Sequence, residues 1–131
     1  MIIQQISVFL EHKPGRVVEV TKALSLSGID IQAFNIAESS DFGVFRLIVS
    51  DVEGAVAALT KAGMAVSLTP VLSVNCPNKP GALSEILELI AGKGISVEYM
   101  YAFIHGNATQ AILRTRDIEG CQRSLIEAGI N

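Results

Sequence analysis

The sequence predicts an α+β protein in which one βαββαβ unit occurs twice. The first observation is a repeat, because the turn Lys13-Pro14-Gly15 returns as Lys79-Pro80-Gly81, and 80 minus 14 gives a spacing of 66 residues. Matches at this spacing continue without a gap as far as Ala62-Gly63 and Ala128-Gly129. The second observation is the order of hydrophobic patterns in each copy, which reads strand, helix, strand, strand, helix, strand. We therefore expect two units, residues 1–69 and 70–131.

The first half of each copy reads as a strand, a tight turn and a helix. Ile6, Val8 and Leu10 alternate with Ser7 and Phe9, which predicts a strand with one buried face. The Lys-Pro-Gly turn ends this strand. Apolar residues at helical spacing follow the turn in both copies, namely Val17, Val20 and Leu24, then Leu83, Ile86, Leu87 and Ile90. Gly28 and Gly94 come where such a helix ends in a left-handed residue.

The second half of each copy reads as a hairpin, a helix and a last strand. The hairpin turns are expected at residues 39–43 and 105–107, and the returning strands at 44–49 and 110–115. Asp51 and Asp117 are placed to cap the second helix of each copy. A strand at 65–69 ends at Pro70, and the first strand of the second copy covers 71–76. This element order predicts the ferredoxin-like arrangement with antiparallel sheets.

The second copy lacks its own last strand. The residues equivalent to 65–69 would be 131–135, and the sequence stops at Asn131. An unpaired edge beside the strand at 71–76 would invite aggregation. We expect the neighbouring unit, the N-terminal run Met1–Gln5 or another chain to fill this position.

The strand around Tyr99 and Tyr101 is apolar on both faces. Tyr99, Tyr101 and Phe103 alternate with a second apolar set, Met100, Ala102 and Ile104. A strand of this kind is typically buried on both faces. We expect the sheet to meet another sheet or subunit there.

Composition excludes several classes of function. The net charge is −3, and lysines and arginines form no cluster beyond Arg114 and Arg116, so we expect no nucleic-acid binding. No stretch approaches the roughly 18 apolar residues of a membrane span, and residues 1–10 do not resemble a signal peptide, which predicts a cytoplasmic protein without a membrane partner. Cys76 and Cys121 form no CxxC motif, and we interpret both as small apolar core residues.

The sequence predicts neither a metal site, nor a cofactor, nor an enzyme. His12 and His105 lie in predicted turns without a second histidine or cysteine at metal-ligand spacing. The nucleophile elbow, the phosphate-binding loop and the dinucleotide fingerprint are all missing from the sequence. Acylphosphatases, heavy-metal carriers and RNA-binding domains share the predicted topology. The CxxC of a metal carrier and the aromatic, basic sheet face of an RNA binder are missing, and residues 12–16 only faintly resemble the arginine-bearing phosphate loop of an acylphosphatase.

The sequence resembles ACT domains, which sense amino acids in many enzymes of amino-acid metabolism. The resemblance rests on the turn, the helix, the Gly-Ile-x-Ile run at Gly28 and the duplication taken together. The resemblance covers both copies. It implies two ACT-type units paired side by side, with a small ligand between the Lys-Pro-Gly turn of one unit and the corner of the other. By corner we mean the end of the first helix of a unit with the start of its second strand.

The resemblance implies two candidate ligand sites. One would combine Asn78, Lys79, Gly81, Ala82 and Leu83 with Gly28, Ile29, Asp30 and Ile31. Its mate would combine His12, Lys13, Gly15, Arg16 and Val17 with Gly94, Ile95, Ser96 and Val97. The family often has Asp or Asn where this chain has His12 and Asn78, so the second turn matches the family better.

Elementary chemistry supports a carboxylate at these turns. The glycine leaves the backbone unshielded, and the N–H groups that follow it are the unpaired donors of a helix start. Asp30 can pair with an ammonium group, whereas Ser96 offers only a hydroxyl. We therefore predict unequal sites, with the Asn78/Asp30 site the better one. Asp30 can also be interpreted as an ordinary solvated strand residue. Lys13 and Lys79 can be interpreted as residues whose aliphatic stems only cover the turns.

The sequence thus predicts a regulatory protein that binds a free amino acid or a similar small carboxylate. Its output would be a change in assembly, as a homo-oligomer such as a dimer, or in contact with a separate partner protein. The alternative is an interaction module that docks a partner protein through the sheet face at Tyr99 and Tyr101.

Overall fold

The computed structural model describes residues 1–38 and 41–131, with His105 described in its backbone alone. The chain divides into two compact units. The first unit is Gln4–Thr69, and the second is Pro70–Asn131 together with Met1–Ile3. The start of the chain therefore belongs with the second half of the sequence.

The first unit has the βαββαβ order that the sequence predicts. Its elements are β1 (Ile2–Glu11), α1 (Arg16–Leu26), β2 (Ile31–Glu38), β3 (Phe42–Val49), α2 (Val52–Lys61) and the start of β4 (Ala65–Cys76). The strands lie in the order β2-β3-β1-β4, with antiparallel pairing of β1 and β2 to β3. Leu47 on β3 lies opposite Ile6 on β1 and Phe34 on β2. The predicted turn at Ser39 and Ser40 lies outside the described residues.

The second unit repeats this order. It contains the rest of β4, α3 (Ala82–Gly92), β5 (Val97–His105), β6 (Ala108–Thr115) and α4 (Ile118–Glu127). β6 pairs antiparallel with both β4 and β5, so that Leu113 lies opposite Leu72 and Ile112 opposite Tyr101. Two copies of the ferredoxin-like unit with antiparallel sheets confirm the predicted fold class.

The start of β1 fills the position of the missing strand, which confirms one of the three predicted solutions. The Ser73 N–H donates to the Met1 carbonyl at 2.8 Å, and the Met1 amino group donates to the Ser73 carbonyl at 2.8 Å. Ile2 packs against the core of the second unit. Further along β4, the Asn75 N–H donates to the Asn131 carbonyl at 2.6 Å. These bonds satisfy backbone groups that would otherwise form an open edge.

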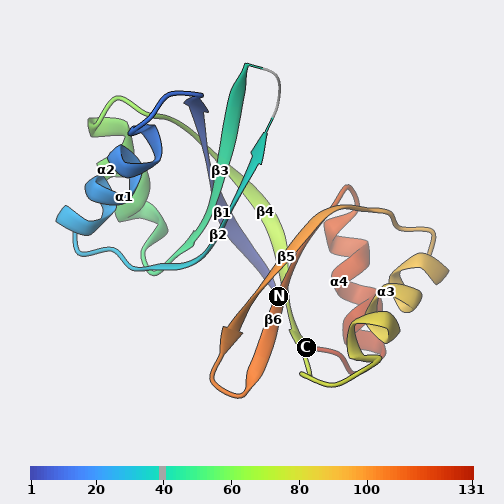
Figure 1. The fold of residues 1–131 in the computed structure, drawn as a ribbon. Coiled ribbons are helices and arrows are strands. Elements are labelled where there is room, and N and C mark those ends of the chain that lie inside the picture. The colour runs from blue at the N-terminus through green and yellow to red at the C-terminus, as the bar shows by residue number, and fades with distance from the viewer. Residues whose placement is uncertain (39–40) are drawn as a thin grey trace. The chain divides into compact units, whose positions relative to one another are not determined.

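In each unit two helices cover one face of the sheet, as Figure 1 shows, and the core lies between them. The first core consists of Ile6, Val8, Leu10, Val20, Leu24, Ile29, Phe45, Leu47, Val49, Ala55 and Leu59. The second consists of Leu72, Val74, Cys76, Ala82, Ile86, Ile90, Ala111, Leu113, Cys121 and Leu125. Most of these residues were expected from the periodic patterns. Three residues of the predicted helix stripes lie outside these cores: Val17 and Leu83 are exposed on the first turn of their helices, and Leu87 is half-buried.

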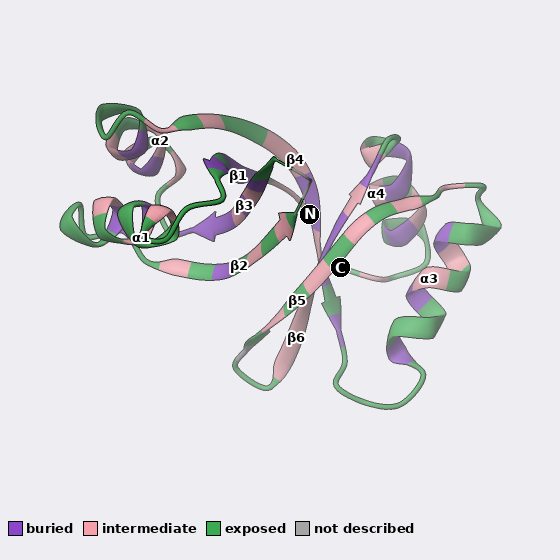
Figure 2. Cartoon of the chain, turned by 45° about the horizontal axis from the view of Figure 1, so that its top comes forward, coloured by how far each residue is buried: buried purple, intermediate pink, exposed green. Residues whose placement is uncertain are grey.

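Two further predictions are wrong in detail. Pro70 does not separate two strands, because β4 runs through it from Ala65 to Cys76, and the fixed φ of proline suits an extended chain. β5 is not buried on both faces, since Met100 and Ile104 are 44% and 78% exposed. β5 is an edge strand, and among its described hydrophobic residues Val97 alone packs against the second core. Figure 2 shows the resulting alternation of half-buried and exposed residues along β5.

The predicted helix ends are confirmed. Gly28 and Gly94 have φ of 71° and 74°, and the N–H of Ile29 and of Ile95 returns to a carbonyl five residues earlier, which is the Schellman motif. Asp51 accepts a hydrogen bond from the Gly54 N–H at 3.0 Å, and Asp117 accepts one from Gly120 at 3.0 Å. A Cβ on either glycine would collide with the capping carboxylate, which explains why this glycine is repeated.

Candidate functional site

Each Lys-Pro-Gly turn leads directly into a helix whose first N–H groups lack a side-chain cap. Gly15 and Gly81 stand at the N-cap positions of α1 and α3 with φ of 87° and 89°, a left-handed conformation that glycine adopts without steric cost. The turns close through weak bonds of 3.3 Å, from the Arg16 N–H to the Lys13 carbonyl and from Ala82 to Lys79. The turns are exposed in both units. Each unit thus has one helix that begins at its Lys-Pro-Gly turn without a side-chain cap, and carboxylate binding there stays a prediction.

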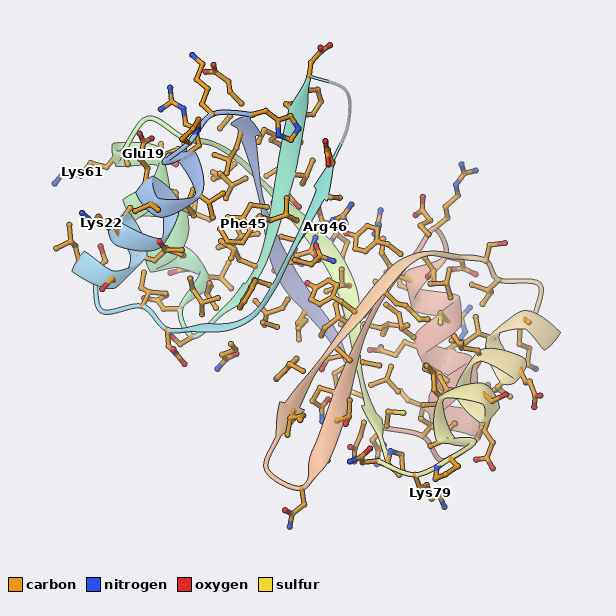
Figure 3. The ribbon with its side chains drawn as sticks, in the orientation of Figure 1. Glu19, Lys22, Phe45, Arg46, Lys61 and Lys79 are labelled. Carbon is orange, nitrogen blue, oxygen red and sulfur yellow. The ribbon has the colours of Figure 1, made fainter. Side chains whose placement is uncertain are left out.

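A largely apolar hollow of about 370 Å³ lies beside the first turn. Its lining combines the turn with α1, β2 and β3: Leu10, Glu11, His12, Lys13, Pro14, Val17, Ile36, Gly43 and Phe45. His12 lies 3.9 Å from the Glu38 carboxylate, and the Phe45 ring meets Phe34 edge-on at 6.4 Å between centroids. Figure 3 shows Phe45 within the first unit. Three predicted contact residues, His12, Lys13 and Val17, therefore share one hollow.

The two corners differ in what surrounds them. In the first unit, Ser50 closes the corner, since its Oγ accepts from the Asp30 N–H at 3.0 Å and its own N–H donates to the Asp30 carbonyl at 3.0 Å. The Asp30 side chain is exposed. In the second unit Arg116 replaces Ser50, and a hollow of about 500 Å³ opens, lined by Lys93, Gly94, Ile95, Ser96, Glu98, Arg116 and Asp117.

Sequence reasoning missed the charged lining of the second corner. Glu98 Oε1 lies 3.7 Å from Arg114 Nε, and the Asp117 side chain caps α4. Lys93 and Arg116 form no ion pair with any described residue. Two cations beside Ser96 therefore make this corner attractive to an anionic group. The sequence contains a signal for this difference, because Ser50 in the first copy corresponds to Arg116 in the second.

Within one unit the turn and the corner are far apart. They lie at opposite ends of the same 11-residue helix, α1 or α3, which spans roughly 16 Å. A single unit therefore does not assemble either of the predicted sites. The pairing of Asn78 with Asp30, and of His12 with Ser96, stays a prediction from the resemblance.

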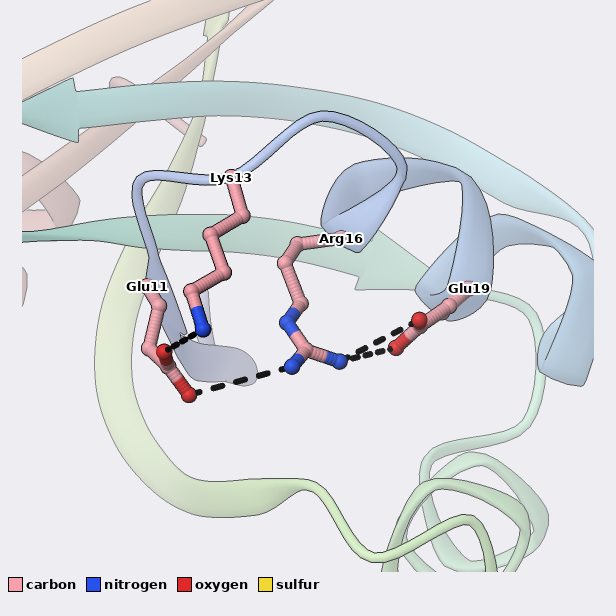
Figure 4. Close-up of polar contacts among 4 residues, drawn as sticks. All are labelled: Glu11, Lys13, Arg16 and Glu19. Atoms are coloured by element: carbon pink, nitrogen blue, oxygen red, sulfur yellow. Dashed lines mark hydrogen bonds and ion pairs between the residues drawn. The ribbon is translucent and has the colours of Figure 1, made fainter.

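Arg16, a predicted ligand contact, is already engaged by carboxylates. Figure 4 shows a chain of alternating charges, Lys13, Glu11, Arg16 and Glu19. Lys13 Nζ lies 3.0 Å from Glu11 Oε2, Arg16 Nη2 lies 3.9 Å from Glu11 Oε1, and Arg16 Nη1 lies 2.9 Å from Glu19 Oε2. The hydrogen bond to Lys13 and the charges of Lys13 and Arg16 lower the pKa of Glu11, and Glu19 and Glu11 raise the pKa of Arg16. A ligand at Arg16 would have to compete with these contacts.

The lowered pKa of Glu11 makes stability depend on pH. Because the pKa lies below its ordinary value of 4.5 in the folded state, the ionised carboxylate stabilises the fold fully above pH 4.5, and this contribution is lost as the pH falls through the folded pKa. The difference in unfolding free energy between the wild type and Glu11→Gln should shrink below pH 4.5. Urea unfolding at several pH values measures it. High salt should also reduce the difference, and a difference independent of pH would contradict the prediction.

The described residues contain no group of three or more His, Cys, Asp or Glu side chains able to hold a metal ion. Both thiols are buried, and burial raises the pKa of Cys121, as does the nearby Asp117 charge. Cys121 therefore stays protonated and unreactive at neutral pH. In the described ranges 1–38 and 41–131, no helix has the length and apolar character needed to cross a bilayer.

Comparison with known proteins settles the family. All of residues 1–131 match the family model described as the ACT domain pair. The chain belongs to this family. As an ACT domain pair, it is 40% identical to protein BT0572 from Bacteroides thetaiotaomicron, whose crystal structure aligns with a TM-score of 0.94 over 100% of this chain and 91% of that one.

More distant ACT-pair-like structures share the fold alone. The regulatory subunit of aspartate kinase from Thermus thermophilus, in its ligand-free form, aligns with a TM-score of 0.66 at 17% identity, over 98% of this chain and 95% of that one. The regulatory subunit of aspartate kinase from Thermus flavus gives a TM-score of 0.58 at 16% identity, with coverage of 98% and 95%. Comparison with proteins of curated function finds no match.

Proposed function

We propose that this ACT domain pair is a non-catalytic regulatory module that binds a free amino acid or a similar small carboxylate. The observation that carries the proposal is the left-handed glycine that begins both α1 and α3 without a side-chain cap. Such a helix start offers N–H donors and a partial positive charge to a carboxylate. Lys93 and Arg116 at the second corner add positive charge where the resemblance predicts ligand contact.

The regulatory part of the proposal draws on fold and family. The aspartate kinase subunits that share this fold are described as regulatory, and in this chain we propose the same kind of role without attached catalysis. A ligand can act only through different affinities for two states of the protein. We propose that these states differ in homo-oligomer assembly, such as dimer formation, or in contact with a separate cytoplasmic partner protein.

A thermal-shift screen against the twenty amino acids tests this function. An amino acid present at ten times its Kd stabilises the folded state by about 1.4 kcal/mol, which raises Tm by roughly 3–6 °C for a domain of this size. We expect selective stabilisation by one amino acid or a few related ones. A flat response to all twenty would contradict the proposal. A flat response together with a stable complex in pull-down would favour the interaction module at Tyr99 and Tyr101.

Matched variants then compare the two proposed sites. Asp30→Ala and Ser96→Ala change equivalent positions, both of which are exposed. If Asp30 pairs with the ammonium group of the ligand, Asp30→Ala weakens binding by about tenfold, whereas Ser96→Ala has the smaller effect. Calorimetric titration of the stabilising amino acid measures both. Equal affinities for Asp30→Ala and the wild type would remove Asp30 from the site, and two identical sites would contradict the predicted inequality.

A further inference from the structure

The two units carry equivalent hollows beside the first turn of α1 and of α3. In the first unit, a hollow of about 290 Å³ is lined by residues that include Phe9, Glu11, Arg16 and Gly63. In the second unit, a hollow of about 240 Å³ is lined by residues that include Asn75, Pro77, Ala82 and Gly129, each 66 residues later. The two hollows therefore occupy the same place in the fold and differ in their side chains.

The first unit fills this place with its own charges. Lys13, Glu11, Arg16 and Glu19 form a chain of positive, negative, positive and negative groups (Figure 4). The two inner members, the Glu11 carboxylate and the Arg16 guanidinium, both line the hollow. The outer members, Lys13 and Glu19, each have a partner of opposite charge.

The second unit keeps the outer charges and lacks the inner ones. Lys79 and Glu85 correspond to Lys13 and Glu19, and both line the hollow. Pro77 and Ala82 stand where the first unit has Glu11 and Arg16. Lys79, labelled in Figure 3 at the turn before α3, and Glu85 make no ion pair with any described residue. Lys79 and Glu85 thus border a hollow that lacks the carboxylate and the guanidinium that Glu11 and Arg16 supply in the first unit.

A small zwitterion supplies both missing groups in one molecule. We infer that the hollow of the second unit binds an aliphatic amino acid, with its carboxylate on Lys79 and its ammonium group on Glu85. Ala82, Ile86 and Ile130 provide apolar lining for a short side chain. The volume of about 240 Å³ lies below the roughly 300–1000 Å³ of sites for drug-sized ligands, which favours a small ligand.

The inference rests on the proposed function for the class of ligand, and it adds a location within a single unit and an orientation. It also explains why the first unit would not bind in the same way. There the ion pair between Glu11 and Arg16 already occupies the equivalent position. Because Lys79 and Glu85 are both exposed, solvent and salt weaken each contact, and binding should be sensitive to ionic strength.

The test uses L-valine, isovalerate, which lacks the ammonium group, and isobutylamine, which lacks the carboxylate. Calorimetric titration of the full chain should show L-valine binding at least about tenfold more tightly than either analogue. Lys79→Gln and Glu85→Gln should each weaken L-valine binding by about tenfold. L-valine binding no tighter than that of both analogues, or unaffected by both substitutions, would overturn the inference.

Ala82→Arg provides a variant that blocks the site while retaining Lys79 and Glu85. It installs the residue that the first unit has at the equivalent position, and we expect L-valine binding to be lost. Because Ala82 is buried and belongs to the second core, the fold of this variant is checked first. Lys22→Gln, which removes an exposed lysine of α1 that lines neither hollow, should leave L-valine affinity unchanged. Circular dichroism and Tm report whether Ala82→Arg is folded, and if it is not, the two glutamine variants decide.

The same titrations separate failure of this inference from failure of the proposed function. If the screen of twenty amino acids finds a stabilising one, but Lys79→Gln, Glu85→Gln and Ala82→Arg all bind it like the wild type, the proposed function stands and this location is wrong. If no amino acid stabilises the protein, both fail together.

Discussion

Replacing Leu113 with alanine is expected to lower the free energy of unfolding by about 2–5 kcal/mol. Leu113 is fully buried on β6, lies opposite Leu72 on β4 and belongs to the core of the second unit. The substitution removes apolar contacts and leaves a cavity that the surrounding side chains fill only in part. Urea unfolding followed by circular dichroism measures the change as a lower midpoint at constant slope.

The repeat provides a matched partner for this experiment. Leu47 occupies the equivalent position on β3 and is also fully buried, so Leu47→Ala should cost a similar amount. Ile104→Ala serves as the control, because Ile104 is 78% exposed and its truncation should change stability by less than about 0.5 kcal/mol. A loss below about 1 kcal/mol for both leucine variants would show that the two cores are not packed as described.

Removing the start of β1 is the second change with a large expected effect. A variant in which a single initiator methionine replaces residues 1–3 loses the paired hydrogen bonds between Met1 and Ser73 and the packing of Ile2. The Ile2 N–H also donates to the Gln122 side chain at 3.0 Å. These three hydrogen bonds and the partly buried Ile2 side chain together predict a loss of about 2–4 kcal/mol.

Amide hydrogen exchange locates this effect. The Ser73 N–H should exchange much faster in the shortened variant, because its acceptor is the Met1 carbonyl. The Ile29 N–H, which donates to the Leu24 carbonyl within the first unit and belongs to a buried core residue, reports whether the loss is confined to the second unit. Ile2→Val, which retains the backbone bonds, should be nearly neutral. Unchanged protection of Ser73 would mean that the start of β1 does not pair with β4 in solution.

The fold was predictable because each local signal occurs twice. The glycines at 28 and 94 and the caps at Asp51 and Asp117 depend on backbone geometry that few residue types satisfy, so their positions could be predicted from the sequence. The missing last strand followed from the alignment of the copies. Its replacement by Met1–Ile3 was only one of three expectations, because strand pairing between distant segments has no local signature.

The candidate site was less predictable. Arg16 was expected to contact a ligand, and the structure shows its guanidinium between Glu11 and Glu19. Such ion pairs depend on side-chain directions that spacing alone does not give. The difference between the hollows at Arg16 and Ala82 likewise needed the comparison of two equivalent places in three dimensions.

The grouping of Met1–Ile3 with the second unit also limits how the two repeats can be separated by genetic deletion. A deletion that discarded the first copy would take away a strand from the second, so the remaining product would expose the edge of β4. The two repeats therefore cannot be separated at the repeat boundary without exposing backbone groups of β4.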